Sequence, residues 1–194
     1  MARPDVLALM PARGGSKSIP RKNVLVVGGK PLIAHSIVQA RAVKLITRTI
    51  VSTDDAEIAD VAKAFGAEVP FTRPAEFAQD RSLDLDVFRH ALAWLRDHES
   101  YRPDLVVHLR PTGPVRRVER IDAAIQMMLD DPAADSLRSV SAPVQSPYKM
   151  WRIDGGRLEP LLRIPGVDEA HSSPRQGLPA VSAAAQPWSC RCRR

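Results

Sequence analysis

The sequence predicts an α/β fold in which a mostly parallel sheet carries helices on both faces. Three observations lead to this prediction: short aliphatic runs typical of buried strands, amphipathic helical patterns between them, and polar loops after the strands. Strands that alternate with helices in this way run parallel, so their carboxyl ends meet at one edge of the sheet. Ligands bind beyond that edge in open α/β sheets, and we expect the site there.

The first strand is the aliphatic run Val6–Met10, which is followed directly by a loop over 11–23. A short extended segment over 24–27 and a glycine turn lead to a helix that begins at Pro31, because proline is favoured at the first helical position. The apolar stripe of this helix is spaced by three and four residues. It consists of Leu32, Ile33, Ile37, Val38 and Ala42.

The second strand is Thr49–Thr53, and the amphipathic helix after it ends at Gly66. Asp54 and Asp55 lie between the two. A Ser-Thr-Asp-Asp run before a helix is primarily an N-cap signal, although two carboxylates are also potential metal ligands.

The pattern continues with a brief strand over 69–71, a loop over 73–84 and a long helix. The apolar positions of that helix are Leu85, Phe88, Ala91, Leu92 and Leu95. A third clear strand, Leu105–Leu109, precedes a loop over 110–114. Another helix over 121–129 and a strand over 136–141 follow it. The four loops at 11–23, 54–55, 73–84 and 110–114 are all expected at the carboxyl edge of the sheet.

The loop after the first strand carries the strongest functional signal. Residues 12–23 read Ala-Arg-Gly-Gly-Ser-Lys-Ser-Ile-Pro-Arg-Lys-Asn, with four cations at Arg13, Lys17, Arg21 and Lys22. Glycines let the backbone approach a ligand closely, and free N–H groups with cations stabilise phosphate oxygens. Pro20 interrupts the segment, so neither a P-loop nor a dinucleotide-binding motif fits. The loop is therefore expected to wrap around a nucleotide triphosphate; the alternative is a solvated basic loop.

Composition favours a small anionic substrate over nucleic acid. The chain has 194 residues, 44% hydrophobic and 26% charged, with a net charge of +6. Its cations are spread along the chain, and only 5% of residues are aromatic, with no interleaved basic and aromatic stretch for base stacking. No apolar stretch approaches membrane-spanning length, and the N-terminus does not resemble a signal peptide. We therefore expect a cytoplasmic protein with no membrane partner.

Together, five motifs resemble those of the acylneuraminate (CMP-sialic acid) cytidylyltransferase family. They are residues 12–23, Val-Ser-Thr-Asp-Asp at 51–55, Arg-Pro-Ala-Glu-Phe-Ala-Gln-Asp at 73–80, Leu-Arg-Pro-Thr-Gly-Pro-Val-Arg at 109–116 and Pro-Arg-Gln-Gly-Leu-Pro at 174–179. The resemblance implies a Rossmann-like three-layer nucleotidyltransferase fold with a small dimerisation arm. It also implies transfer of CMP from CTP to the anomeric hydroxyl of a nonulosonic acid, with Mg²⁺ (or Mn²⁺), for surface polysaccharide or glycoconjugate biosynthesis.

The resemblance further implies residue roles. Arg13 and Lys22 would stabilise the triphosphate and the departing pyrophosphate. The nucleotide-binding residues would be Ala12, Gly15, Ser16, Lys17, Asn23 and Arg73. The residues facing the acidic nine-carbon sugar would be Arg110, Thr112, Arg175 and Gln176, since a guanidinium grips both carboxylate oxygens. Arg175 is alternatively a subunit-contact residue, and the family also implies a homodimer.

The histidines and cysteines give weaker signals. His108 lies within an apolar strand and is more often a satisfied core residue than a base, and His171 is more often a surface-loop residue than a substrate contact. His35, His90 and His98 share no ligand spacing. The only cysteines, Cys190 and Cys192, form an isolated Cys-x-Cys pair, which is a weak metal signal.

Two departures from the family pattern affect the expected activity. Arg110 stands where sialic acid enzymes of the best-known bacterial type have glutamine, which admits legionaminate- or pseudaminate-like sugars. After residue 180 the family's Asn-Gly strand and the Asp-x-Asp pair that binds Mg²⁺ are not found, so the metal ligands are unknown. The ending is typical of a frameshift or a truncation, and we expect weak or absent activity of residues 1–194 alone.

The expected organisation is a nucleotide-binding α/β domain over 1–141, an arm for dimerisation and sugar contact over 142–180, and an aberrant, disordered tail over 181–194. The alternatives to the sialic-type enzyme are a cytidylyltransferase for 3-deoxy-octulosonate and a catalytically crippled nucleotide-binding remnant. A nucleic-acid-binding protein ranks last among the hypotheses, because only the net charge supports it.

Overall fold

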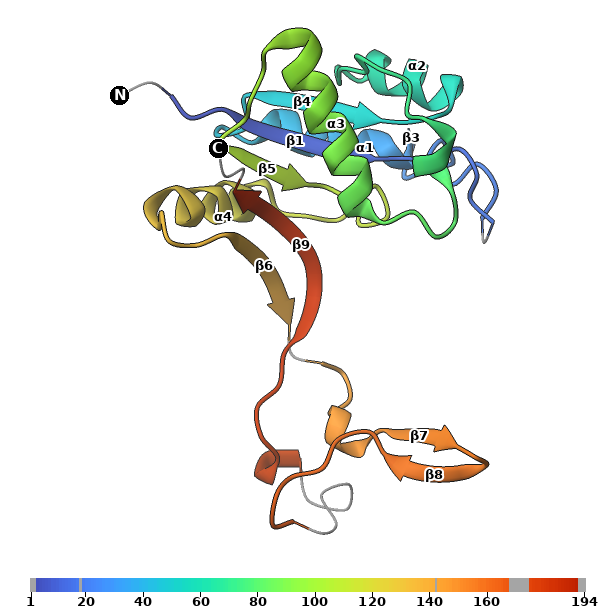
Figure 1. Ribbon diagram of the computed structural model, residues 1–194, viewed down its shortest axis with the longest axis vertical. Helices are drawn as coiled ribbons and strands as arrows, with labels where there is room; N and C mark the ends of the chain where they lie inside the picture. Colours follow the sequence, from blue (N-terminus) through green and yellow to red (C-terminus); the bar gives the residue numbers. More distant parts are fainter. Residues whose placement is uncertain (1–2, 18, 142, 168–174, 192–194) are drawn as a thin grey trace. The chain divides into compact units, whose positions relative to one another are not determined.

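The computed structural model describes residues 3–17, 19–141, 143–167 and 175–191 (Figure 1). The chain divides into two compact units. One consists of Met1–Leu137 with Trp188–Arg194, and the other of Arg138–Pro187. The boundary falls inside the last predicted strand, four residues before the expected boundary at 141.

A five-stranded sheet has the order β4-β1-β5-β9-β6. Its strands are β1 (Val6–Pro11), β4 (Arg48–Ser52), β5 (Leu105–His108), β6 (Ser136–Ser141) and β9 (Ala183–Arg191). Central β1 pairs in parallel with both β4 and β5, and Leu9 lies opposite Ile50 on one side and His108 on the other. β9 instead pairs antiparallel with β5.

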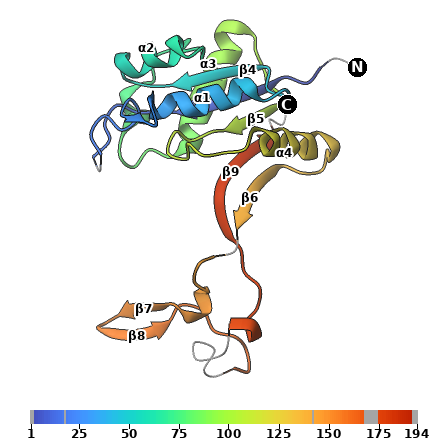
Figure 2. The same cartoon turned by 180° about the vertical axis from the view of Figure 1, so that it is seen from behind.

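Helices cover both faces of this sheet, as Figures 1 and 2 show from opposite sides. The helices are α1 (Leu32–Ala42), α2 (Ala56–Ala64), α3 (Asp84–Glu99) and α4 (Val118–Asp130). Alternate β1 side chains point to opposite faces, with Ala8 and Met10 in the core under α1, α2 and α4. Leu7 and Leu9 pack with Leu95 of α3 on the other face. The predicted three-layer α/β fold with a mostly parallel sheet is therefore confirmed.

The remaining elements are short. β2 (Val26–Val27) and β3 (Lys30–Pro31) form an antiparallel pair across the predicted glycine turn. The predicted strand over 69–71 is replaced by isolated bridges that join Glu68 to Ile50 and Thr72 to Thr53. The 3₁₀ helices are η1 (Ala75–Ala78), η2 (Pro147–Lys149) and η3 (Arg175–Gly177).

Among its described residues, the second unit contains a two-stranded hairpin, β7 (Trp151–Asp154) with β8 (Arg157–Pro160). Its apolar side chains are unusually open, with Ile153 77% and Leu158 65% exposed. The proline- and glycine-rich segment thus forms little core of its own within the described residues.

Two details of the sequence interpretation are wrong. Val38, Ala42 and Leu85 are exposed, because neighbouring positions turn toward the sheet instead; Ala34 and Ala40 are fully buried in α1. The region after residue 180, expected to lack regular structure, contains β9. The physical reason is that the edge of β5 presents unpaired N–H and C=O groups, which a strand can satisfy through its backbone whatever its side-chain pattern.

Within the described residues, no helix combines the length and the hydropathy needed to cross a membrane.

Candidate active site

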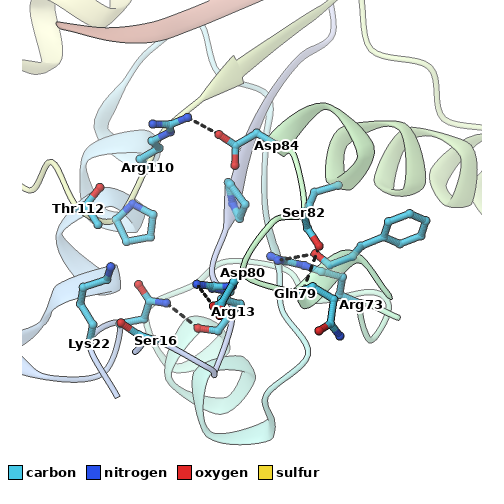
Figure 3. A pocket seen from close by; sticks show the side chains of 15 residues that line it. Arg13, Ser16, Lys22, Arg73, Gln79, Asp80, Ser82, Asp84, Arg110 and Thr112 are labelled. Atoms are coloured by element: carbon cyan, nitrogen blue, oxygen red, sulfur yellow. Dashed lines mark hydrogen bonds and ion pairs between the residues drawn. The ribbon is translucent and has the colours of Figure 1, made fainter. Parts of the chain in front are cut away.

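A pocket lies at the carboxyl edge of β1 and β5, where the sequence predicts a site (Figure 3). Its walls come from the loop after β1, the segment between β4 and α3, and the loop after β5. The lining residues are Pro11, Arg13, Ser16, Lys22, Asn23, Arg73, Phe77, Gln79, Asp80, Ser82, Asp84, Val87, Arg110, Pro111 and Thr112. Seven of the predicted site residues thus line one pocket: Arg13, Ser16, Lys22, Asn23, Arg73, Arg110 and Thr112.

Backbone contacts hold the loop after β1 in position. The N–H of buried Ala12 donates to the Ser52 carbonyl at 3.0 Å, which extends the pairing of β1 with β4. The Gly14 N–H donates to Asp54 Oδ1 at 3.0 Å, and Asn23 Nδ2 donates to the Arg13 carbonyl at 2.9 Å. Ala12 and Asn23 therefore shape the loop from within, and Gly15 lies on its exposed surface.

Two of the four cations of the loop share one carboxylate, and the other two do not. Arg13 Nη2 lies 2.8 Å from Asp80 Oδ1, and Lys17 pairs with Asp80 Oδ2. Lys22 lines the pocket, and no carboxylate among the described residues pairs with it. Arg21 turns away to the start of α2, so it is not part of the pocket.

The interpretation of Asp55 as an N-cap is confirmed. Its Oδ1 accepts a hydrogen bond from the Ile58 N–H at 3.0 Å, and its Oδ2 lies 2.5 Å from Arg21 Nη1. The Arg21 guanidinium and the Ile58 N–H hold the pKa of Asp55 below its usual range. With Asp54 bonded to Gly14, both carboxylates have structural partners.

Arg73 is 4% exposed and its guanidinium faces oxygens of the chain itself. Nε donates to Ser52 Oγ at 3.1 Å, Nη2 donates to the Ser52 carbonyl, and Nη1 reaches the Phe77 carbonyl at 3.5 Å. Burial lowers its pKa to about 10. Arg73 therefore joins the end of β4 to the η1 segment and shapes one wall of the pocket.

Arg110 lies at the end of β5 and pairs with Asp84, the first residue of α3 (Figure 3). The Arg110 carbonyl accepts hydrogen bonds from Ser36 Oγ, at 3.3 Å, and from Arg116 Nη2. Arg116 Nη1 also donates to Ser36 Oγ at 2.9 Å. The backbone of Arg110 is thus fastened to α1 while its side chain faces the pocket.

His108 is a core residue, as interpreted from the sequence, but it is not satisfied. Its side chain is 5% exposed, its Nε2 has no hydrogen-bond partner among the described residues, and it lies 4.0 Å from Asp84 Oδ2. The Phe88 ring packs edge-on against it with centroids 4.7 Å apart. Burial lowers the pKa of His108 to about 4, so it is neutral at pH 7.

Sequence reasoning missed the carboxylates of the pocket and the arginine behind it. Asp80 closes the motif over 73–80, and Asp84 stands in the first turn of a helix, where acidic residues are common for reasons of the helix dipole. Arg116 closes the motif over 109–116. The only sequence signal for Asp80 and Arg116 as site residues was their position within the motifs. The spacing of residues along the chain does not show which cation each carboxylate meets.

The described residues contain no group of three or more His, Cys, Asp and Glu side chains that could hold a metal ion. The two pocket carboxylates, Asp80 and Asp84, are each ion-paired with cations. The described side chains therefore do not form a metal site on their own.

The other predicted sugar-contacting residues belong to the second unit. Gln176 is exposed in η3, and the backbone of Arg175 begins that helix. The side chain of Arg175, His171 and Cys192 lie outside the described residues, as does the Cys190 side chain.

Comparison with known proteins shows that the chain belongs to the cytidylyltransferase family, whose profile matches residues 7–151. It is 41% identical to CMP-N,N'-diacetyllegionaminic acid synthase of Legionella pneumophila over 124 residues, 63% of this chain and 52% of that protein. It is 34% identical to N-acylneuraminate cytidylyltransferase of Escherichia coli O18:K1:H7 over 64% of this chain and 28% of that protein. The family recognised from the motifs is confirmed.

A solved structure of CMP:2-keto-3-deoxy-manno-octonic acid synthetase complexed with CTP shares the fold, with a TM-score of 0.67 and 22% identity. That match covers 96% of this chain and 74% of the other. The chain spans about half the length of the first curated relatives it matches, 52% and 47%.

Proposed function

We propose that the chain transfers CMP from CTP to the anomeric hydroxyl of a nonulosonic acid, which gives the CMP-sugar and pyrophosphate. The observation that carries this proposal is the pocket, which brings Arg13, Lys22 and Arg110 together. Such a pocket suits two anionic substrates that must meet, a triphosphate and a sugar acid. The names of the relatives support the same chemistry.

The reaction needs charge stabilisation and positioning more than a covalent nucleophile. The anomeric oxygen forms a bond to the α-phosphorus as it loses its proton, and the bond to the pyrophosphate oxygen breaks. Arg13 and Lys22 would stabilise the negative charge that grows on the departing pyrophosphate. Gly15, Ser16 and Lys17 would face the phosphates along the loop.

On the sugar side, Arg110 would grip the carboxylate of the substrate and Thr112 would donate to its oxygens. Arg175 and Gln176 stay predicted sugar contacts on the family resemblance alone. The relatives include proteins named for legionaminic, pseudaminic, acylneuraminic and 3-deoxy-manno-octulosonic acids. We therefore propose the nonulosonic acids as the substrate class, with 3-deoxy-octulosonate as the alternative.

Mg²⁺ (or Mn²⁺) is proposed only as an ion that accompanies the nucleotide. Mg²⁺ is usually held by one or two carboxylates together with substrate phosphates, so a cage of three side chains is not required. We also propose a cytoplasmic homodimer, supported by the resemblance and by the exposed apolar side chains of the second unit. Sedimentation of the purified chain at several concentrations tests the dimer.

Lys22→Ala provides the test of the reaction. We expect it to lower kcat/KM for CMP-sugar formation about 100-fold, the usual cost of removing one group that stabilises transition-state charge. Lys63→Ala, at an exposed position of α2, is the matched control and should leave the rate unchanged. The assay is mass spectrometry of CTP incubated with a panel of nonulosonic acids.

If wild-type protein binds CTP in calorimetry but forms no CMP-sugar with any acid, the remnant hypothesis replaces the enzyme. If it binds neither CTP nor pyrophosphate, the pocket is not a nucleotide-binding site.

A further inference from the structure

Asp80 occupies the position between two cations of the loop after β1. Its Oδ1 lies 2.8 Å from Arg13 Nη2, and its Oδ2 pairs with Lys17 Nζ, so each oxygen serves one cation (Figure 3 shows the Arg13 pair). Both carboxylate oxygens are therefore engaged with the side chains that, in the proposed function, meet phosphate. A carboxylate that holds two such cations is an internal stand-in for a phosphate group.

The backbone around Asp80 does not depend on these ion pairs. The Gln79 N–H donates to Ser82 Oγ at 3.0 Å, and Ser82 Oγ donates to the Glu76 carbonyl at 3.0 Å. Gln79 Nε2 donates to the Ala75 carbonyl at 2.7 Å. The turn that carries Asp80 therefore keeps its shape if the Asp80 side chain moves away.

The loop after β1 is fastened independently as well. Gly14 is bonded to Asp54, Asn23 to the Arg13 carbonyl, and Arg21 to Asp55, all without Asp80. The contacts of Arg13 and Lys17 with Asp80 are consequently exchangeable, whereas the contacts that shape the pocket are not.

Because the three side chains are partly or largely exposed, a phosphate ligand can readily replace Asp80 at the two cations. The side chains of Arg13, Asp80 and Lys17 are 30%, 39% and 83% exposed, and ion pairs in such surroundings are weak. A polyphosphate brings more charge and more acceptor oxygens than one carboxylate. Lys17 and Arg13 hold the pKa of Asp80 below its usual range, so the competing carboxylate is charged at neutral pH.

We infer that Asp80 is an internal counter-anion, which competes with phosphate ligands for Arg13 and Lys17 and thereby promotes release of pyrophosphate. The inference rests on the proposed function, to which it adds a means of favouring the release of pyrophosphate over the release of CTP. A triphosphate with a nucleoside attached has other contacts to offset the displacement of Asp80, whereas free pyrophosphate has only its charges. Asp80 returns to the cations as pyrophosphate leaves.

Asp80→Asn in the full chain tests this inference, because the inference predicts tighter rather than weaker binding of pyrophosphate. Calorimetry should show pyrophosphate binding roughly three- to tenfold tighter than in wild type, because two exposed ion pairs no longer compete. CTP should also bind more tightly, while cytidine, which has no phosphate, should bind as in wild type. Inhibition of CTP turnover by added pyrophosphate should strengthen by the same factor.

Asp86→Asn is the matched control. It removes the same charge six residues away, at a half-buried position that pairs with Arg89 and does not line the pocket. It should change none of the three affinities, which separates local competition from the overall charge of the protein. Circular dichroism and thermal unfolding of both variants establish that they are folded.

Weaker or unchanged pyrophosphate binding in Asp80→Asn would overturn the inference, since a carboxylate that only orients the cations or joins two loops gives that result. Wild type that binds pyrophosphate but not CTP defeats the proposed function alone. Wild type that binds neither ligand defeats both.

Discussion

At the residue scale, three cations in or beside the pocket already have carboxylate partners. Arg13 and Lys17 share Asp80, and Arg110 pairs with Asp84. Lys22 differs because no carboxylate pairs with it within the described part of the chain. Under the proposed function, an anionic substrate displaces internal carboxylates at two places, whereas Lys22 can bind it without any displacement.

His108 leads to a prediction about pH. Burial lowers its pKa from 6.5 to about 4, so between these values the unfolded chain binds a proton that the folded chain does not. His108 leaves the free energy of unfolding at its full value above pH 6.5 and lowers it progressively as the pH falls toward 4. From pH 6.5 to pH 5 we expect a loss of about 2 kcal/mol in the free energy of unfolding.

Urea unfolding of wild type and His108→Asn at pH 5 and pH 7 measures this loss. The variant should show a smaller difference between the two pH values, whereas His98→Asn, at an exposed position of α3, should behave as wild type. Equal pH dependence in His108→Asn and wild type would show that His108 is not the group responsible.

At the scale of elements, the loop after β1 and the start of α2 are folded as one piece. Asp54 and Asp55 follow β4, and one binds the loop at Gly14 while the other caps α2 and holds Arg21. Arg21 has a φ of 55°, a left-handed conformation uncommon for a residue with a side chain. Its two acidic partners, Asp55 and Glu57, compensate for that conformation.

Gly14→Ala tests this coupling. A Cβ at Gly14 would lie 2.6 Å from Asp55 Oδ2, so the N-cap and the Arg21 pair must both move. We expect the free energy of unfolding to fall by about 1–2 kcal/mol, the usual range for a lost cap. Gly15→Ala is the control, because nothing lies within 4 Å of its added Cβ.

Thermal or urea unfolding of the two variants distinguishes the outcomes. Equal stability of Gly14→Ala and Gly15→Ala would mean that Asp55 relaxes without cost and that the loop and helix are independent.

At the scale of the whole molecule, β9 covers an edge of the sheet that the parallel strands leave open. It pairs antiparallel with β5, with Val106 opposite Cys190 and Val107 opposite Ser189. An uncovered edge of an apolar strand is a site of aggregation. The last described residues thus belong to the sheet of the first unit.

Ser189→Pro should disrupt this edge, because proline has no N–H to donate to a neighbouring strand. We expect faster amide hydrogen exchange in β5 and more aggregation than in wild type. Ser182→Pro, which lies before β9, should leave β5 exchange unchanged. Protected β5 amides in Ser189→Pro would show that β9 does not contribute to the edge.

Much of the fold could be predicted because its signals are local. The aliphatic run before residue 11, the helical spacing of Ile33 and Ile37, and the Ser-Thr-Asp-Asp cap signal all depend on residues close in sequence. The exposed Val38 was mispredicted because spacing identifies an apolar stripe but not its width. β9 was missed since its place depends on the partner strand rather than on its own pattern.

By itself, the sequence determined the family, the layered α/β fold and the position of the cation-rich loop at the carboxyl edge of the sheet. Those features follow from periodicity and from motifs that are continuous along the chain. Only the tertiary structure decided that Asp80 meets Arg13 and Lys17, that Asp84 meets Arg110 and that Arg21 faces α2. These contacts join residues from separate loops, and the packing of helices on both faces of the sheet brings them together.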